Sequence, residues 1–325
     1  MMHGACTDQL PARAPSSTKE DILVFTARIE IKTPPRFSFW RTVYSHGWCA
    51  LPPFSVDKEN GSLSRLFELK DGSLVFCKVK GKPFGLHVKT RSRKSLTFHQ
   101  RTQIRDLLSE CLRLREDFSA FYKEAQRQPH YRWIPKAGAG RLLRAPSVFE
   151  DVVKMICTTN CSWALTEVMV GNLTALLGKS LGDGLSSFPS PASIAGTTEA
   201  FLRKNIRSGY RSPYILELAS AVARGKLDLE AWRSSTLPTD ELFEQVKSVK
   251  GMGDYAAGNI LKLLGRYDYL GLDSWVRGRF YELHAKGRRV RDTVIEKHYA
   301  SLGQWKGLFF WLEMTRHWFS HKFPF

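Results

Sequence analysis

The feature that most restricts how this chain can fold is the tetrapeptide Lys-Gly-Met-Gly at residues 250–253. Residues 238–248 before it and residues 254–265 after it both place apolar side chains at helical spacing. Glycine accepts positive φ angles and lets another backbone approach closely. The sequence therefore predicts two helices joined by one tight turn, a helical hairpin that spans residues 238–266.

The start of the second helix is a candidate anion site. A helix that begins directly after a glycine turn offers its unpaired N–H groups and the positive end of its dipole to an anion. We therefore expect a phosphate group to be held by Lys250, Gly251, Met252, Gly253 and Asp254. A plain corner between two helices, closed by a glycine C-cap, is the simpler alternative and stays open.

The net charge favours the phosphate interpretation. Lys and Arg number 49 against 31 Asp and Glu, which gives a formal charge of +18 and a pI near 9.8. The positive excess is spread over both halves of the chain. A globular chain this basic is typical of a protein that binds a polyanion, most often nucleic acid, although a basic surface can also serve solubility alone.

The pattern of apolar residues divides the chain into three regions. Residues 1–20 contain "PARAPSST" and are predicted to be a disordered leader. Residues 21–127 contain β-rich runs with a Lys-Asp-Gly-Ser turn at 70–73, and then change to helical spacing. Residues 128–325 read as helical throughout. The predicted fold is an α+β N-terminal domain, with an antiparallel sheet and a helix, followed by an all-α domain that contains the hairpin.

Asp273 opens the next helical pattern, in the segment "LGLDSW". Because Asp is a preferred N-cap residue, a cap alone would explain it. A helix-hairpin-helix followed by Gly or Pro and then Asp also resembles the signature of the helix-hairpin-helix/Gly-Pro-Asp DNA glycosylase superfamily. In this chain Leu272 stands where proline is frequent in that superfamily.

The resemblance extends over residues 130–320 as an ordered set of segments. "SVFEDVVKMICTTNCSWALTEVMVGNLTALLG" is similar to a helix pair of the 8-oxoguanine glycosylases and of bacterial 3-methyladenine glycosylase II. "FPSPASIAG", "IRSGYRSPYI" and "SLGQWKGLFFWLEM" follow in the same order as in those groups, and residues 39–54 resemble their N-terminal domain more weakly. The resemblance implies an enzyme that flips a damaged base out of double-stranded DNA and breaks its N-glycosidic bond.

The resemblance also implies roles for single residues. Asp273 matches the invariant aspartate that stabilises positive charge on the sugar. The bifunctional relatives carry a Schiff-base lysine where this chain has Tyr255, so we predict a monofunctional enzyme that leaves an abasic site. Lys250 and Lys262 lie nearby without matching that position, and a substitute lysine stays an alternative. Asn160, in "TTN", matches the residue that fills the hole left by the flipped base, or it caps a helix.

The base pocket is expected to contain Tyr255, Trp275 and Trp311, with core packing as the alternative role for the tryptophans. Electron-rich rings attract a cationic base, and no general acid accompanies Asp273, which favours alkylated purines of the 3-methyladenine or 7-methylguanine type. The alternative substrate is 8-oxoguanine, for which Gly47 would be the reader in the N-terminal domain. A DNA-binding module without catalysis is the third alternative.

The remaining predictions concern cofactors, partners and location. The resemblance implies a monovalent cation, Na⁺ or K⁺, on the main-chain carbonyls of Lys247, Val249 and Met252. No organic cofactor is expected, and no iron-sulfur cluster, because no cysteine follows Cys161. We expect a monomer that binds double-stranded DNA and no membrane. Scattered cysteines and no apolar leader indicate an intracellular chain, in a nucleoid or a nucleus.

Overall fold

The computed structural model describes residues 24–319 and residue 323, so the predicted leader at 1–20 lies outside the described residues. A five-stranded antiparallel sheet forms within them, in the order β1-β5-β4-β3-β2. Its strands are β1 (Phe25–Lys32), β2 (Ser55–Asp57), β3 (Ser62–Glu68), β4 (Leu74–Lys82) and β5 (Gly85–Ser92). The predicted turn at 70–73 connects β3 to β4, with Gly72 at φ +80°. The antiparallel sheet expected in the N-terminal part is therefore confirmed.

One face of the sheet is buried and the other faces solvent. Along β1 and β5 the residues alternate between buried and exposed or half-buried, as a sheet covered on one side requires. The helix α2 (Phe98–Cys111) buries Ile104, Leu108 and Cys111, and it starts with a capping box formed by Thr97 and Gln100. Between β1 and β2 the chain forms α1 (Phe39–Val43) and a 3-10 helix at Gly47–Ala50.

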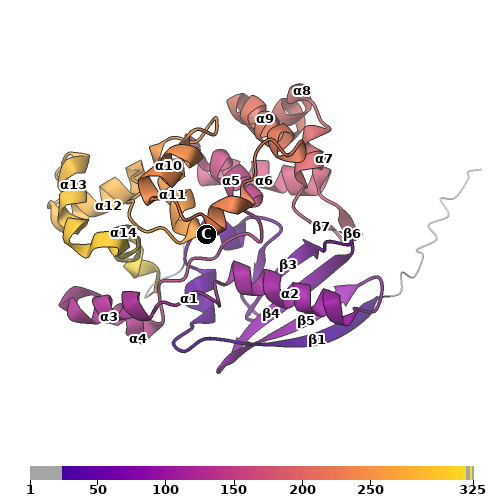
Figure 1. The fold of residues 1–325 in the computed structure, drawn as a ribbon, viewed down its shortest axis with the longest axis horizontal. Coiled ribbons are helices and arrows are strands. Elements are labelled where there is room, and N and C mark those ends of the chain that lie inside the picture. Colours follow the sequence, from indigo (N-terminus) through magenta and orange to yellow (C-terminus); the bar gives the residue numbers. More distant parts are fainter. Residues whose placement is uncertain (1–23, 320–322, 324–325) are drawn as a thin grey trace, which may run out of the picture.

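The chain beyond α2 is largely helical, and Figure 1 shows the helices from residue 148 onward above the sheet, with the two helices at residues 119–137 beside it. Their bounds are α3 (Ser119–Arg127), α4 (Trp133–Ala137), α5 (Val148–Thr158), α6 (Trp163–Leu177), α7 (Pro191–Ala195), α8 (Glu199–Phe201), α9 (Ser212–Ala223), α10 (Thr239–Lys247), α11 (Asp254–Leu264), α12 (Ser274–His284), α13 (Asp292–Tyr299) and α14 (Lys306–Met314). The predicted hairpin is present as α10 and α11.

The prediction of an all-α second part was wrong at one place. A two-stranded hairpin forms from β6 (Ser180–Gly182) and β7 (Leu185–Ser186). Its turn, Gly182-Asp183-Gly184, has positive φ at all three residues. Glycine adopts positive φ with little strain, so two of these three positions cost little conformational energy. The strands are too short to produce a readable alternation in the sequence.

Buried polar contacts join the sheet to the helical part. Glu150 on α5 pairs with Arg65 of β3 at 2.5 Å and with Lys154 at 2.7 Å, and all three side chains are at most 4% exposed. Trp48 Nε1 donates to Asp151 Oδ1 at 2.7 Å. The apolar core is continuous across both parts. The division of the chain into domains at residues 21–127 and 128–325 stays a prediction.

None of the helices formed by residues 24–319 is both long enough and apolar enough to cross a membrane.

Candidate active site

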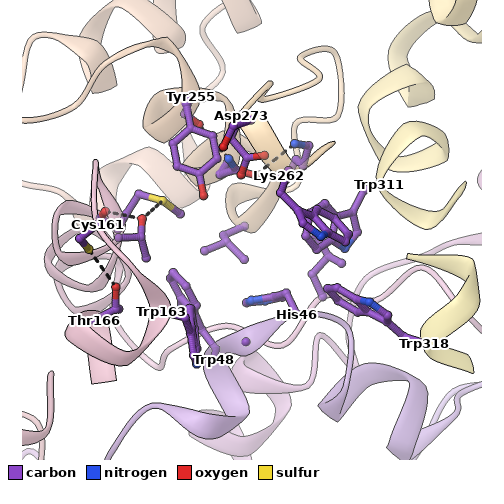
Figure 2. Close-up of a pocket in the computed structure, with 18 of the residues that line it drawn as sticks. His46, Trp48, Cys161, Trp163, Thr166, Tyr255, Lys262, Asp273, Trp311 and Trp318 are labelled. Atoms are coloured by element: carbon purple, nitrogen blue, oxygen red, sulfur yellow. Dashed lines mark hydrogen bonds between the residues drawn. The ribbon is translucent and has the colours of Figure 1, made fainter. Parts of the chain in front are cut away.

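A cavity of about 530 Å³ lies where the sheet part meets the helices. Its walls come from the 3-10 helix at Gly47–Ala50, the α5–α6 junction, α11, the start of α12, and α14 (Figure 2). The side chains most relevant to chemistry or recognition are His46, Trp48, Cys161, Trp163, Tyr255, Asn259, Lys262, Asp273, Trp275, Trp311 and Trp318. Segments far apart in sequence therefore converge on one space.

Asp273 lies at the N-terminus of α12 and lines the cavity. Its Oδ1 accepts the backbone N–H of Val276 at 2.8 Å, so the predicted N-cap is present. The side chain is half-buried, and Figure 2 shows the carboxylate directed into the cavity beside Tyr255 and Lys262. The cap fixes one oxygen, which leaves the other available for a ligand.

Lys262 is a second charged group of the cavity, and it is only 2% exposed. Its Nζ donates to Asn259 Oδ1 at 3.2 Å and to the carbonyl of Leu270, in the segment that leads to Asp273. Burial lowers the pKa of Lys262 to about 7, against the attraction of Asp273, which raises it. A substantial fraction of this amine is therefore neutral near pH 7.

Tyr255 lies in the first turn of α11, and its ring lines the cavity. Burial, with the negative charge of Asp273 second, raises the pKa of its hydroxyl well above the usual value. The phenol is thus uncharged at neutral pH and has no amine chemistry to offer.

Aromatic rings form much of the cavity wall. The structure brings the predicted Trp275 and Trp311 together, with ring centroids 6.3 Å apart. Trp311 is anchored, because its Nε1 donates to the carbonyl of Ser45 at 2.9 Å, whereas Trp275 is 43% exposed. Sequence reasoning missed Trp48, Trp163 and Trp318, which line the same space.

Gly47 lies in the cavity wall under the ring of Trp163. A Cβ atom at residue 47 would lie 2.3 Å from Trp163 Cη2, so no larger residue fits without displacing that ring. The neighbouring His46 is half-buried and also lines the cavity, and its ring Nε2 donates to the carbonyl of Leu143 at 2.5 Å. Burial lowers the pKa of His46 to about 4, so this imidazole is neutral.

The hairpin turn lies outside the cavity. Gly251 has φ +90°, which favours glycine, and the N-cap of α11 is Gly253, which provides no side-chain acceptor. The first N–H groups of α11 are therefore available to an external acceptor. Lys250 is exposed and pairs with Glu217 at 2.8 Å, whereas Met252 is 4% exposed and can offer only its main chain outward.

The main-chain carbonyl oxygens at the end of α10 and in the turn after it are ligands of the kind that a hard monovalent cation binds. Val249 O accepts the N–H of Met252 at 3.0 Å, and no hydrogen bond within the described part of the chain uses the carbonyls of Lys247 and Met252. The side chain of Lys247 pairs instead with Asp254 at 2.8 Å. Main-chain oxygens without donors are ligands that hard cations accept.

Asn160 follows α5 with φ +46°, in an exposed position. It does not cap α6, because Ser162 Oγ accepts the N–H of Leu165 at 3.3 Å in that role. The preceding carbonyl, Thr159 O, accepts hydrogen bonds from Tyr210 Oη at 3.3 Å and from the buried guanidinium of Arg211. The loop that presents Asn160 is thus held in place by the 3-10 turn at Gly209–Arg211, directly before α9.

The proteins that this chain resembles in sequence or in structure are named as glycosylases. No protein-family model matches the chain. A curated protein of Methanothermobacter thermautotrophicus, named probable N-glycosylase/DNA lyase, is 24% identical over 242 residues, which cover 66% of this chain and 76% of that protein.

Two solved structures superpose over 90% of this chain. The 3-methyladenine DNA glycosylase from Archaeoglobus fulgidus has a TM-score of 0.70 with 21% identity over 99% of its length. The apo 8-oxoguanine glycosylase/lyase of Clostridium acetobutylicum has a TM-score of 0.70 with 19% identity over 98% of its length. With the hairpin and Asp273 in the predicted places, this chain has the fold of the helix-hairpin-helix/Gly-Pro-Asp DNA glycosylases.

Proposed function

We propose that this protein is a DNA N-glycosylase that excises damaged purines and leaves an abasic site. The observation that carries the proposal is the position of Asp273, a half-buried carboxylate held by its cap in the wall of an aromatic cavity. The names of the similar proteins, which are glycosylases for 3-methyladenine and for 8-oxoguanine, support the same class of reaction.

Asp273 has the chemistry that cleavage of an N-glycosidic bond requires. Positive charge develops on the deoxyribose as the base departs, and a preorganised carboxylate stabilises that charge in a poorly solvated site. The bond from Val276 N–H holds one carboxylate oxygen, so the free oxygen orients or deprotonates the attacking water. The base must first leave the stack, and the cavity is the space that receives it.

The cavity wall favours alkylated purines as substrates. A purine methylated at N3 or N7 is cationic, and ring faces such as those of Trp275 and Trp311 attract a cation. His46 adds no opposing charge, because its pKa is about 4. The leaving group needs little protonation, which agrees with a site that has one carboxylate.

The alternative substrate is 8-oxoguanine, and one observation favours it. Gly47, the reader that the resemblance implies, lies in the cavity wall, where the ring of Trp163 excludes any side chain. A tightly packed glycine of this kind is what a main-chain contact to a base would need.

We propose a monofunctional reaction, because Tyr255 stands at the nucleophile's place and a phenol forms no imine. Lys262 is the alternative nucleophile, since it lines the cavity with a pKa of about 7, and the curated relative is named a lyase as well as a glycosylase. Borohydride trapping on an abasic duplex decides between them. A covalent complex that Lys262→Met abolishes and Lys250→Gln keeps would establish Lys262 as the nucleophile, and no complex would support the monofunctional reaction.

The partner is double-stranded DNA containing a damaged base. The α10–α11 turn and Lys250 bind its phosphate groups, and Asn160 fills the space that the flipped base leaves in the base stack. The protein acts as an intracellular monomer, and the hairpin carbonyls hold Na⁺ or K⁺. A DNA-binding module without catalysis would bind in the same salt-sensitive way and release no base.

The test is a single-turnover panel of duplexes carrying 7-methylguanine, hypoxanthine, 1,N6-ethenoadenine or 8-oxoguanine, with the released base measured by chromatography. Fast release of 7-methylguanine supports the proposed substrate, whereas preferential release of 8-oxoguanine supports the alternative. Tight binding without release from any duplex would overturn the enzymatic proposal.

A further inference from the structure

The solvent-facing side of the sheet carries cations that the strand register places next to one another. Arg28 of β1 is directly opposite Lys89 of β5, and Lys89 is directly opposite Lys78 of β4. Directly opposed residues have Cβ atoms about 4.5–5.5 Å apart, and like charges in such pairs destabilise a sheet. Three neighbouring strands thus present a row of like charges.

The neighbouring rows of the same face extend this charge. Lys80 of β4 is opposite His87 of β5, and Gly85 is opposite both Lys82 of β4 and Lys32 of β1. We call this surface the basic sheet face. It consists of Arg28, Lys32, Lys78, Lys80, Lys82 and Lys89.

Most of this charge is not neutralised locally. Lys78 pairs with Asp57 at 2.9 Å, and Glu30 lies 3.5 Å from His87. No other residue in the described part of the chain forms an ion pair with the remaining cations of the face, Arg28, Lys32, Lys80, Lys82 and Lys89. Repulsion among these unpaired cations weakens the fold. We therefore expect an external anion to neutralise their charge.

The face is open where the cations gather. The adjoining end of the sheet is covered by the β6–β7 hairpin, where Asp183 pairs with Arg91 of β5 at 3.1 Å. Lys80 and Lys82, toward the opposite end, and Lys89, in the middle of β5, are exposed. In Figure 1, β1, β4 and β5 lie along the lower part of the molecule, whereas α10 and α11 lie in its upper part. The basic sheet face is thus separate from the hairpin and from the cavity.

We propose that the basic sheet face binds the phosphate backbone of a second segment of double-stranded DNA. Side chains on one face repeat every two residues, about 7 Å along a strand, so the lysines form an extended array of point charges. Such an array matches a long polyanion and reads no base sequence. Binding in this way lets one protein molecule hold two DNA segments.

An anionic membrane is the rival occupant. Phe84, at the tip of the β4–β5 hairpin, is 92% exposed and would insert among lipids. Membrane-surface binding relies on a broad apolar face beside the basic one, and a single phenylalanine does not provide it. The charge pattern therefore favours DNA.

The experiment compares two triple variants of the full chain that remove equal charge. The sheet variant is Lys80→Gln/Lys82→Gln/Lys89→Gln, and the control variant is Lys123→Gln/Lys136→Gln/Lys297→Gln, whose lysines are exposed on α3, α4 and α13. Thermal unfolding checks that both fold. Native mass spectrometry and sedimentation at low salt count undamaged duplexes, each about one helical turn long, bound per protein.

We expect two duplexes on the wild type and on the control variant, and one on the sheet variant. For the site on the basic sheet face, log K should fall with log salt concentration with a slope of about −0.9 for each phosphate contacted. Binding of DNA at this site should vanish in the sheet variant. If the proposed function fails because the hairpin side binds no DNA, the wild type binds one duplex and the sheet variant none, and the present proposal stands.

Equal duplex counts on the wild type and the sheet variant would overturn the proposal. Binding to phosphatidylserine vesicles that the sheet variant loses, without any second duplex on the wild type, would overturn it in favour of a membrane.

Discussion

Asp273 caps α12 with the same carboxylate that faces the cavity, since its Oδ1 accepts the N–H of Val276 at 2.8 Å. The cap and the catalytic role proposed for this residue are therefore compatible. Asn caps a helix about as well as Asp, whereas Ala does not. We expect Asp273→Asn to change the free energy of unfolding by less than about 0.5 kcal/mol and Asp273→Ala to lower it by about 1 kcal/mol. Urea denaturation measures both, and equal losses would contradict the capping role.

Gly47→Ala should impair excision, because its Cβ would lie 2.3 Å from Cη2 of Trp163. Displacing a wall residue by about 1 Å can cost up to about 100-fold in rate, so we expect a 10- to 100-fold slower single turnover. The control is Gly171→Ala on α6, the helix that also carries Trp163, where an added Cβ meets nothing within 4 Å. Equal rates for the two variants would show that the wall at Gly47 does not position the substrate.

Glu150→Gln should destabilise the protein strongly, because it leaves Arg65 and Lys154 as buried cations without their partner. Breaking a buried ion pair in this way costs about 3–5 kcal/mol. Glu199→Gln is the control, since Glu199 pairs with Arg203 at 2.6 Å on the surface and should cost less than about 1 kcal/mol. Chemical denaturation would contradict the account if the two losses were similar.

Stability should depend on pH through His46, whose pKa falls from 6.5 to about 4 on folding because the ring is buried. Between these values the unfolded chain binds a proton that the native protein does not, so the free energy of unfolding falls as pH is lowered. From pH 7 to pH 4.5 the wild type should lose about 2–3 kcal/mol relative to His46→Gln. Burial raises the pKa of Asp151 to about 6, which acts in the opposite direction but cancels in this difference. A difference that stays flat with pH would contradict a His46 that is held neutral in the folded protein.

Local patterns in the sequence were sufficient to predict much of the fold. The Lys-Asp-Gly-Ser turn and the helical spacing around the Gly-Met-Gly turn depend on neighbouring residues, and both appear in the structure as predicted. The β6–β7 hairpin was missed, although Gly182-Asp183-Gly184 is a turn signal, because its strands have two or three residues.

The cavity wall could be predicted only in part. Asp273 and Tyr255 lie close to the hairpin in sequence, whereas Trp48, Trp163 and Trp318 come from distant segments that only tertiary packing brings together. The position of Lys262 in the cavity wall could be predicted from its spacing to Tyr255. This lysine lies seven residues after Tyr255, and residues at that spacing share one face of a helix.

The central claim, that Asp273 drives excision, is tested most directly by single-turnover cleavage of a duplex containing 7-methylguanine. Wild type and Asp273→Asn are compared with and without alkali, which cuts the strand at an abasic site. We expect strand breaks only after alkali for the wild type, and a rate about 100- to 1,000-fold lower for Asp273→Asn with DNA binding retained. Excision by Asp273→Asn at the wild-type rate would contradict the account.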